Sequence, residues 1–306
     1  MRPLAPELAP GSADSRWAQA RVMLTYLWRH HRLPDLSAAP RFTELVQRRK
    51  LHCRDPRQTG MMDKVAAKRM AADALGHEWI TPTLWQDVAL PHSPPFQAPA
   101  ILKARHGCNQ YAVLRTRPSE RDWAALRKRS SQWMERPYGK WLDEWSYEGV
   151  PRALIAEPLL GDAFSLPLDY KIYVFGGRAT HVQVHLDRAN NHRWILHDRS
   201  FRPLVRANER VPEPRSLGAM LAAAETLAAG HDFLRVDFFE VNGTPRFGEF
   251  CLYPGSGLDR FAEEWIDFEL GALWHAARGD IAISEHFDVG RYPMMMRYDS
   301  HPDKAF

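Results

Sequence analysis

The chain has 306 residues, of which 45% are hydrophobic and 25% charged, a composition typical of one large or two modest globular domains with a buried core. The net charge of +4 fits an acidic partner such as a nucleotide, but the lysines and arginines are scattered and do not indicate a nucleic-acid-binding stripe. Three cysteines without any CxxC spacing predict neither a zinc site nor a disulfide framework, and they fit a reducing cytoplasm.

The N-terminal third of the chain predicts helices. Residues 1–14 are rich in Pro, Ala and Gly, contain no continuous apolar stretch, and predict frayed structure with neither a signal peptide nor a membrane span. An apolar stripe from Trp17 to Trp28 indicates core or an oligomer contact rather than a membrane anchor, because the polar face is mixed in charge. Asp63 is expected to cap a helix that Gly76 ends. Helices are expected over 15–31, 42–51 and 63–75, followed by a proline-rich connector over 90–99.

From residue 100 onward, short apolar strands are expected between helices. Gly176-Gly177 and Asn242-Gly243 each separate two apolar runs, which is the signal of a β-hairpin. Strands joined by hairpins, with helices between the groups, favour an α+β architecture. Strands are expected over 100–103, 153–156, 170–175, 179–186 and on both sides of residue 242, and helices over 120–134, 216–229 and 263–277.

The last hairpin carries one carboxylate on each strand, Asp237 and Glu249. We predict a three-residue loop over 242–244, because that loop pairs the two acids directly, whereas a two-residue loop would pair Asp237 with Gly248. Directly opposed like charges destabilise a sheet, so either one acid is protonated or a divalent cation lies between them. Carboxylate oxygens suit magnesium. The other interpretation is a pair of ordinary acids on a half-exposed face.

Three more charged residues stand at or near strands. Lys103 ends one strand and leads into a turn whose backbone N–H groups could face phosphate. Glu157 ends another strand, where it could accept a hydrogen bond from an amino or ribose group. Lys171 lies in a strand otherwise suited to burial, and because an unpaired buried lysine is costly, we expect an anion beside it.

The order of these short motifs resembles the ATP-grasp enzymes, and specifically the TupA-like branch, named for a teichuronopeptide biosynthesis protein. The similarity runs from about Phe42 to Ala277, and the many motifs in one order make it more specific than any single one. The motifs that carry it are Asp63-Lys64, Lys103-Ala-Arg-His106-Gly107, Ala156-Glu157, Asp169-Tyr170-Lys171, Gln183-Val184, Asp187-Arg188, Asn191-His192-Arg193, His197-Asp198, Arg235-Val-Asp237, Gly248-Glu249 and Pro254-Gly255-Ser256-Gly257.

The resemblance implies an α+β fold in which two subdomains hold a nucleotide between them. It implies an N-terminal extension over 1–40, partly helical, an N-terminal subdomain over 41–99, a small lid subdomain over 100–160, a C-terminal subdomain with the metal site over 161–290, and a tail over 291–306.

The resemblance also implies a site for ATP and Mg²⁺. Asp237 and Glu249 match the magnesium ligands, which favours the metal over the other readings of this pair. The residues expected to bind the nucleotide are Lys64, Lys103, His106, Gly107, Glu157, Lys171 and Ser256, and those expected to act on the transferred phosphoryl group or the substrate are Arg235, Arg188 and His192.

The implied activity is that of a cytoplasmic ligase that activates a carboxylate as an acyl phosphate for attack by an amine, on a small molecule or a cell-surface glycopolymer precursor. Two alternatives remain. One is a kinase on the same scaffold, in which Asp198 or His192 activates a sugar hydroxyl. The other is a degenerate nucleotide-binding protein, because Cys108-Asn109-Gln110 replaces a glycine-rich loop and Cys251 stands where many ATP-grasp enzymes carry Asn.

Overall fold

A computed structural model describes residues 13–135, 138–161, 166–186, 193–206 and 209–280. The helices are α1 (Ala13–His30), α2 (Phe42–His52), α3 (Arg57–Met62), α4 (Lys64–Leu75), α5 (Glu120–Glu135), α6 (Leu217–Leu227) and α7 (Glu264–Arg278). The strands are β1 (Trp85–Asp87), β2 (Ala100–Ala104), β3 (Tyr111–Leu114), β4 (Leu154–Pro158), β5 (Asp169–Phe175), β6 (Arg178–Leu186), β7 (Arg193–Asp198), β8 (Phe233–Val241) and β9 (Thr244–Cys251). The expected tail over 291–306 lies outside the described residues.

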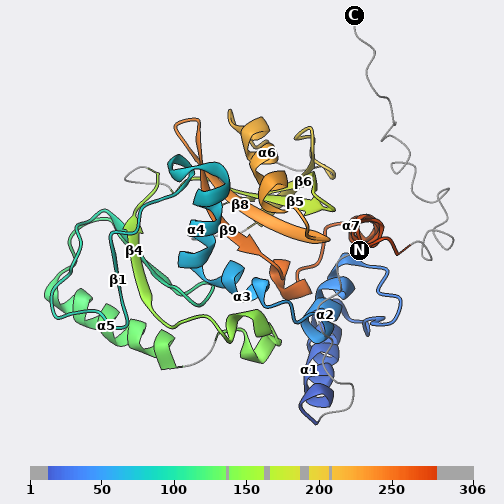
Figure 1. Cartoon of the computed structure of the whole chain (residues 1–306), viewed down its shortest axis with the longest axis horizontal. Coiled ribbons are helices and arrows are strands. Elements are labelled where there is room, and N and C mark those ends of the chain that lie inside the picture. The colour runs from blue at the N-terminus through green and yellow to red at the C-terminus, as the bar shows by residue number, and fades with distance from the viewer. Residues whose placement is uncertain (1–12, 136–137, 162–165, 187–192, 207–208, 281–306) are drawn as a thin grey trace, which may run out of the picture.

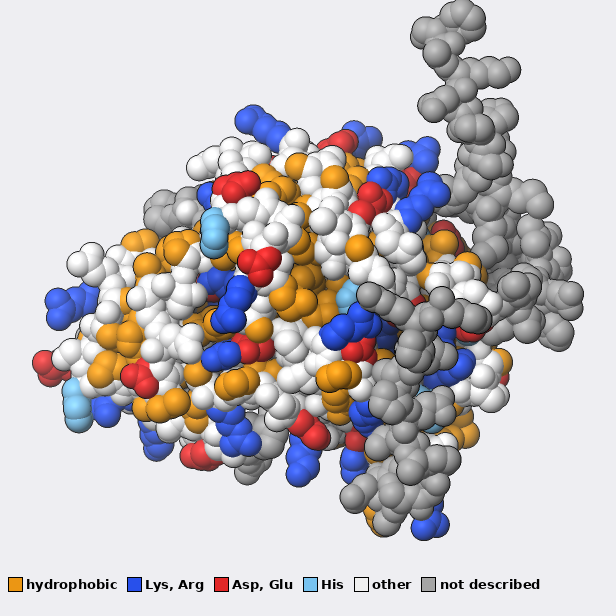
Figure 2. Space-filling model, in the orientation of Figure 1, with side chains coloured by type: hydrophobic (Ala, Val, Ile, Leu, Met, Phe, Trp, Pro, Cys, Tyr) orange, Lys and Arg blue, Asp and Glu red, His pale blue; other side chains and the backbone are white. Residues whose placement is uncertain are grey.

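The described strands form two antiparallel sheets, as the α+β expectation requires. The smaller has the order β1-β4-β2-β3, and the larger has the order β7-β6-β5-β8-β9. Figure 1 shows α5 beside the small sheet and α6 over the large one, with α4 between the two sheets and α1 extending away from them. Lysines, arginines and acidic side chains alternate over the face in Figure 2, and no stripe of one sign crosses its coloured part.

The expected helices form close to their predicted bounds. The Asp63 side chain accepts a hydrogen bond from the backbone N–H of Val65, so it caps α4 as expected, and Gly76 ends the helix with φ 104°. Helix α3 and strands β1, β3 and β7 were not predicted. The core interpretation of the α1 stripe holds for Val22, which is buried, but is wrong for Trp17 and Trp28, which are each 68% exposed. That this stripe makes an oligomer contact stays a prediction.

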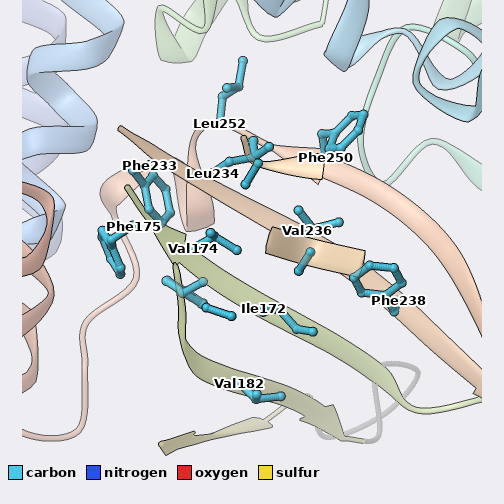
Figure 3. Packing of buried hydrophobic residues seen from close by; sticks show 14 of the residues in the cluster. Ile172, Val174, Phe175, Val182, Phe233, Leu234, Val236, Phe238, Phe250 and Leu252 are labelled. Atoms are coloured by element: carbon cyan, nitrogen blue, oxygen red, sulfur yellow. The ribbon is translucent and has the colours of Figure 1, made fainter. Parts of the chain in front are cut away.

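The large sheet has one apolar and one polar face because its side chains alternate. Ile172 on β5 pairs with Val182 on β6 and with Val236 on β8, and Val236 pairs with Phe250 on β9. These side chains form an apolar layer across the sheet (Figure 3). Helix α6 contacts β5, β6 and β8 and adds its own apolar side chains to the same cluster. The opposite face carries polar side chains over part of its length, and at one end its aromatic side chains, Tyr173, Phe175 and Phe233, pack against Phe42 of α2.

The β8–β9 hairpin corrects the predicted loop but keeps the predicted pairing. Its turn has two residues, Asn242 at φ 53° and Gly243 at φ 78°, and not three. A β-bulge at Gly248 then inserts one extra residue into β9, so Asp237 still pairs with Glu249. The bulge restores the register that the shorter turn would otherwise shift by one.

Gly248 is expected to be required for this bulge. A Cβ atom there would lie 3.0 Å from the carbonyl oxygen of Asp237 and 3.2 Å from the Phe239 ring. We expect Gly248→Ala to lower the free energy of unfolding by about 1–3 kcal/mol, because the backbone must move to admit the methyl group. Gly218→Ala is the control, since a Cβ in that part of α6 meets nothing within 4 Å. Urea unfolding of both variants checks the difference, and equal stabilities would contradict it.

Candidate functional site

A row of polar side chains crosses four strands on the polar face of the large sheet. Gln183 on β6 pairs with Lys171 on β5, Lys171 pairs with Asp237 on β8, and Asp237 pairs with Glu249 on β9. Directly paired residues project to the same side of a sheet. Arg235 lies on this side too, two residues before Asp237. The sheet therefore brings four of the expected site residues together. Lys171 was expected to bind the nucleotide and Arg235 to act on the reacting groups, and Asp237 and Glu249 were the expected metal ligands.

Asp237 lies at the centre of a buried ion-pair network. Its two carboxylate oxygens accept hydrogen bonds from the Arg235 guanidinium at 2.7 and 2.8 Å, and one of them also pairs with the Lys171 ammonium. The Lys171 Nζ lies 2.7 Å from an Asp169 oxygen. Burial alone would raise the pKa of Asp237, but the charges of Arg235 and Lys171 more than offset it and lower that pKa to about 2. Asp237 is therefore ionised at neutral pH.

This network changes the explanation of the paired acids. Protonation of Asp237 is not needed, because two buried cations already compensate its charge. The anion expected beside Lys171 is present as two carboxylates of the protein itself. Glu249 is half-buried, and among the described residues it has no recorded hydrogen bond or ion pair, although its charge helps to raise the pKa of Lys171.

A divalent ion would find two protein carboxylates here. No group of three or more His, Cys, Asp and Glu side chains in the described part of the chain is arranged to hold a metal. Cys251 adds no ligand, because burial raises the pKa of its thiol and a protonated thiol suits magnesium poorly. Asp237 and Glu249 would therefore supply only part of the shell of an ion, and phosphate oxygens of a nucleotide would have to supply the rest.

A second cluster of charges lies at the small sheet. The Glu157 carboxylate at the end of β4 accepts from Lys103 on β2 at 2.6 Å and from Lys68 on α4 at 2.8 Å. Burial raises the pKa of Glu157, but both lysines lower it by more, so the carboxylate stays ionised. Lys68 was not singled out from the sequence. Lys68 follows Lys64 by four residues, so the two lie on the same side of one helix, and this spacing could have identified Lys68 as a further site residue.

The turn after β2 packs against α4 and does not project freely. Lys64 donates a hydrogen bond to the backbone oxygen of Gly107, and Arg105 pairs with Asp63 at 2.5 Å. Cys108 contacts the Tyr147 hydroxyl at 3.3 Å. Burial is the main cause that raises the pKa of the Cys108 thiol, and the charge of Glu249 adds to it. The bulky Cys108-Asn109-Gln110 segment therefore lies close to the carboxylate end of the polar row.

His106 lies in the same turn but is turned away from solvent. Its Nε2 contacts the backbone oxygen of Trp133 at 2.9 Å, and burial lowers the pKa of the ring. A Cβ on Gly107 would lie 2.4 Å from the end of the Gln110 side chain and 3.1 Å from the Tyr138 ring, so a larger residue would have to displace the Gln110 side chain and press against the ring. His106 thus supports the turn, and its direct contact with a nucleotide stays a prediction.

The turn over Pro254–Gly257 is held by α2. The buried Lys50 ammonium donates to the Ser256 backbone oxygen and to its hydroxyl, both at 2.7 Å, and Gln47 donates to the same backbone oxygen at 2.9 Å. Ser256 has φ 58°, a left-handed conformation that is costly for a residue with a side chain. The sequence did not predict a role for Lys50 and Gln47, because a polar residue in a helix normally faces solvent. The contacts compensate the strain of the turn.

The remaining expected site residues, Arg188 and His192, lie outside the described residues. Asp198, which the kinase alternative requires, accepts hydrogen bonds from the backbone of Ser200 and Arg202 and from the Arg202 side chain, at 2.8 to 2.9 Å. These contacts hold a turn after β7.

The sequence matches the TupA-like ATP-grasp family over residues 44–275, which is most of the chain, and the protein belongs to that family. This confirms the expected family and fold class. Among curated proteins, none matches the sequence.

Solved structures of ATP-grasp ligases are similar to this chain at low sequence identity. The ATP-grasp ligase PsnB, in complex with its minimal precursor, is 13% identical, with a TM-score of 0.41 over 73% of this chain and 61% of PsnB. An L-amino acid ligase from Bacillus licheniformis is 13% identical, with a TM-score of 0.43 over 72% of this chain and 48% of the ligase. A D-alanine–D-alanine ligase from Bacillus anthracis is 13% identical, with a TM-score of 0.40 over 74% and 69%. The chain thus spans less than two thirds of the first two proteins.

Helices of the described part of the chain are too short or too polar to cross a bilayer.

Proposed function

We propose that the protein is an ATP-dependent ligase that activates a carboxylate as an acyl phosphate for attack by an amine. The observation that carries the proposal is the buried network of Lys171, Asp237 and Arg235, which faces Glu249 on the polar side of the sheet. The two cations hold the Asp237 carboxylate ionised and in place, where it could serve as a ligand for magnesium, and cations fixed before the reaction would stabilise phosphoryl transfer without reorganisation.

The nucleotide would be held from both sheets. Lys103, Lys64 and Lys171 are assigned to its phosphates, with His106 and Gly107 in the turn that follows Lys103. Glu157 is assigned to the adenine or ribose, and its two lysine partners keep it ionised as an acceptor. Magnesium brought by the nucleotide would be held by Asp237 and Glu249 and would neutralise charge on the phosphates.

The substrates would meet beside Arg235. A guanidinium suits the acyl phosphate, since it offers several donors in a fixed plane. Arg188 and His192 are assigned to the same reacting groups, and Ser256 to the anionic acceptor. Following the family, we propose that the acceptor is a glycopolymer precursor and that the reaction takes place in the cytoplasm, with ATP and Mg²⁺ as cofactors.

Lys103→Met tests the nucleotide assignment. We expect the KM for ATP to rise by about tenfold or more, because one charge-assisted contact to phosphate is worth roughly 1.5–3 kcal/mol. Lys128→Met is the matched control, because Lys128 is exposed on α5 and should leave KM unchanged. Magnesium-dependent release of ADP in the presence of a carboxylate and an amine is the measurement. A KM equal to that of the wild type would remove Lys103 from the site.

A second candidate is a nucleotide-binding protein without turnover. The occupied carboxylate of Asp237 and the absence of a third ligand at Cys251 favour it. Calorimetry of magnesium ATP binding, together with assays of ADP and of amide product, separates the two. Binding without release of ADP supports the second candidate, and formation of an amide supports the ligase. A phosphorylated sugar product would instead support the kinase, although the contacts of Asp198 disfavour that residue as the base.

A further inference from the structure

A cavity of about 490 Å³ lies between the C-terminal end of α1, strand β7 and the segment after the Pro254–Gly257 turn. None of its lining residues belongs to the site assigned above. Its wall combines two indole rings, two guanidinium groups, one imidazole and one carboxylate, and the residues are Trp28, Arg29, His31, Trp194, Asp259 and Arg260.

The walls of the cavity are fixed by contacts on both sides. Arg29 Nε donates to the backbone oxygen of Leu258 at 3.3 Å, and the buried His30 ring contacts the backbone oxygen of Gly257 at 3.1 Å. These two contacts attach the end of α1 to the turn. On the other side, the Trp194 ring packs edge-on against Phe261 with centroids 5.8 Å apart. The cavity thus has a built shape, and its walls come from segments far apart in sequence.

The cavity adjoins the polar face that carries the proposed reaction site. Trp194 pairs with His185, and His185 pairs with Asp169, so the indole projects from the same side of the sheet as the ion-pair network. The charges of both Asp259 and Arg235 act on the buried Tyr173 hydroxyl. The cavity wall at Trp194 therefore lies on the same side of the sheet as Arg235, where the acyl phosphate is proposed to form.

The chemistry of the wall restricts the ligand. Indole faces bind the C–H face of a puckered, saturated ring such as a pyranose, since the face of the aromatic ring is negative and C–H groups are weakly positive. Trp28 is exposed and Trp194 is half-buried. Arg29 and Arg260 supply charged donors for an anion, and a guanidinium matches a carboxylate or phosphate in shape. Asp259 would repel an anion but accepts hydrogen bonds from hydroxyl groups. A ring that carries hydroxyls and one anionic substituent satisfies all three.

We propose that this cavity binds an anionic saccharide, with the ring against Trp194 and Trp28 and the anion at Arg29 and Arg260. The inference rests on the proposed ligase function in one respect: the saccharide is the acceptor side of that reaction. Its binding, however, requires neither ATP nor turnover, so the two proposals are tested separately.

The test uses three probes with the same ring: glucuronic acid, glucose and glucose 6-phosphate. Binding to the full chain is measured by saturation-transfer NMR and by calorimetry. We expect glucuronic acid to bind about tenfold or more tightly than glucose. Tighter binding of glucose 6-phosphate than of glucuronic acid would support the saccharide site and assign the anion as phosphate. Equal binding of all three, or binding of none, would overturn the proposal.

Variants test whether the probes bind in this cavity. Trp194→Ala and Arg260→Gln are each expected to weaken the tightest probe about tenfold, while Trp141→Ala and Arg121→Gln, both exposed elsewhere, leave it unchanged. Loss of binding in the control variants, or no loss in the cavity variants, would also overturn the proposal. Glu249→Gln separates the two functions, because it should remove turnover and keep saccharide binding. If ATP turnover persisted while no probe bound, the proposed saccharide site would be wrong and the proposed ligase function would be unaffected.

Discussion

Replacing Glu249 by glutamine is expected to lower magnesium-dependent ATP turnover by at least about 100-fold while leaving the fold as stable as the wild type. Removal of one fixed electrostatic contact to a reacting phosphoryl group typically costs 100- to 1,000-fold. The stability should not change, because Glu249 is half-buried and has no recorded ion pair within the described residues. Loss of turnover without loss of stability would mark Glu249 as a ligand of the reacting complex.

Asp237→Asn is expected to behave differently, although the two acids are paired across the hairpin. Asp237 compensates two buried cations, Lys171 and Arg235, whose side chains are 4% and 8% exposed. Removing one partner of a buried ion pair costs about 3–5 kcal/mol, because the remaining charges stay buried without compensation. We therefore expect this variant to lose both stability and turnover.

The two variants are compared by ADP release and by urea unfolding at pH 7. Glu213→Gln, exposed before α6, is the control and should match the wild type in both measurements. If Glu249→Gln kept full turnover, the pair of acids would not hold the metal. If Asp237→Asn were as stable as the wild type, the charges of Lys171 and Arg235 would be compensated by other groups.

The hairpin illustrates how far the sequence specifies the site. Alternation of apolar and polar residues predicted that Asp237 and Lys171 lie in strands, and Asn242-Gly243 predicted the turn between β8 and β9. The bulge at Gly248 was not predictable from local pattern, because it depends on how Gly248 packs against the backbone of Asp237 and the ring of Phe239. The predicted pairing was confirmed, but the predicted loop was wrong.

The exposure of α1 and the burial of Lys50 could not be predicted, because both depend on contacts between residues far apart in sequence. The stripe from Trp17 to Trp28 has the same period whether it faces a core or solvent, and only the position of α1 shows that both tryptophans are exposed. Lys50 contacts Ser256 across 206 residues of sequence. No local pattern indicates that a lysine near the end of a helix is buried, since such a position is usually solvated.

Lys50 is expected to make the stability of the protein depend on pH in the alkaline range. Its side chain is almost fully buried, and burial lowers its pKa from 10.5 to about 8, although Glu144 and Asp143 act in the opposite direction. Between these two pKa values the unfolded chain binds one proton more than the folded chain. The free energy of unfolding must then rise with pH over that interval. Below about pH 8 Lys50 is protonated in both states and contributes no slope.

The size of the effect follows from the shift, and Lys50→Met isolates it. The free energy of unfolding of the wild type should rise by on the order of 3 kcal/mol more than that of Lys50→Met between pH 8 and pH 10.5. Urea unfolding at several pH values measures this difference, in which groups that titrate alike in both proteins cancel. Lys128→Met, at an exposed position, should run parallel to the wild type. Parallel curves for Lys50→Met as well would mean that the ammonium reaches water, and Ser256 would then owe its left-handed conformation to Gln47 alone.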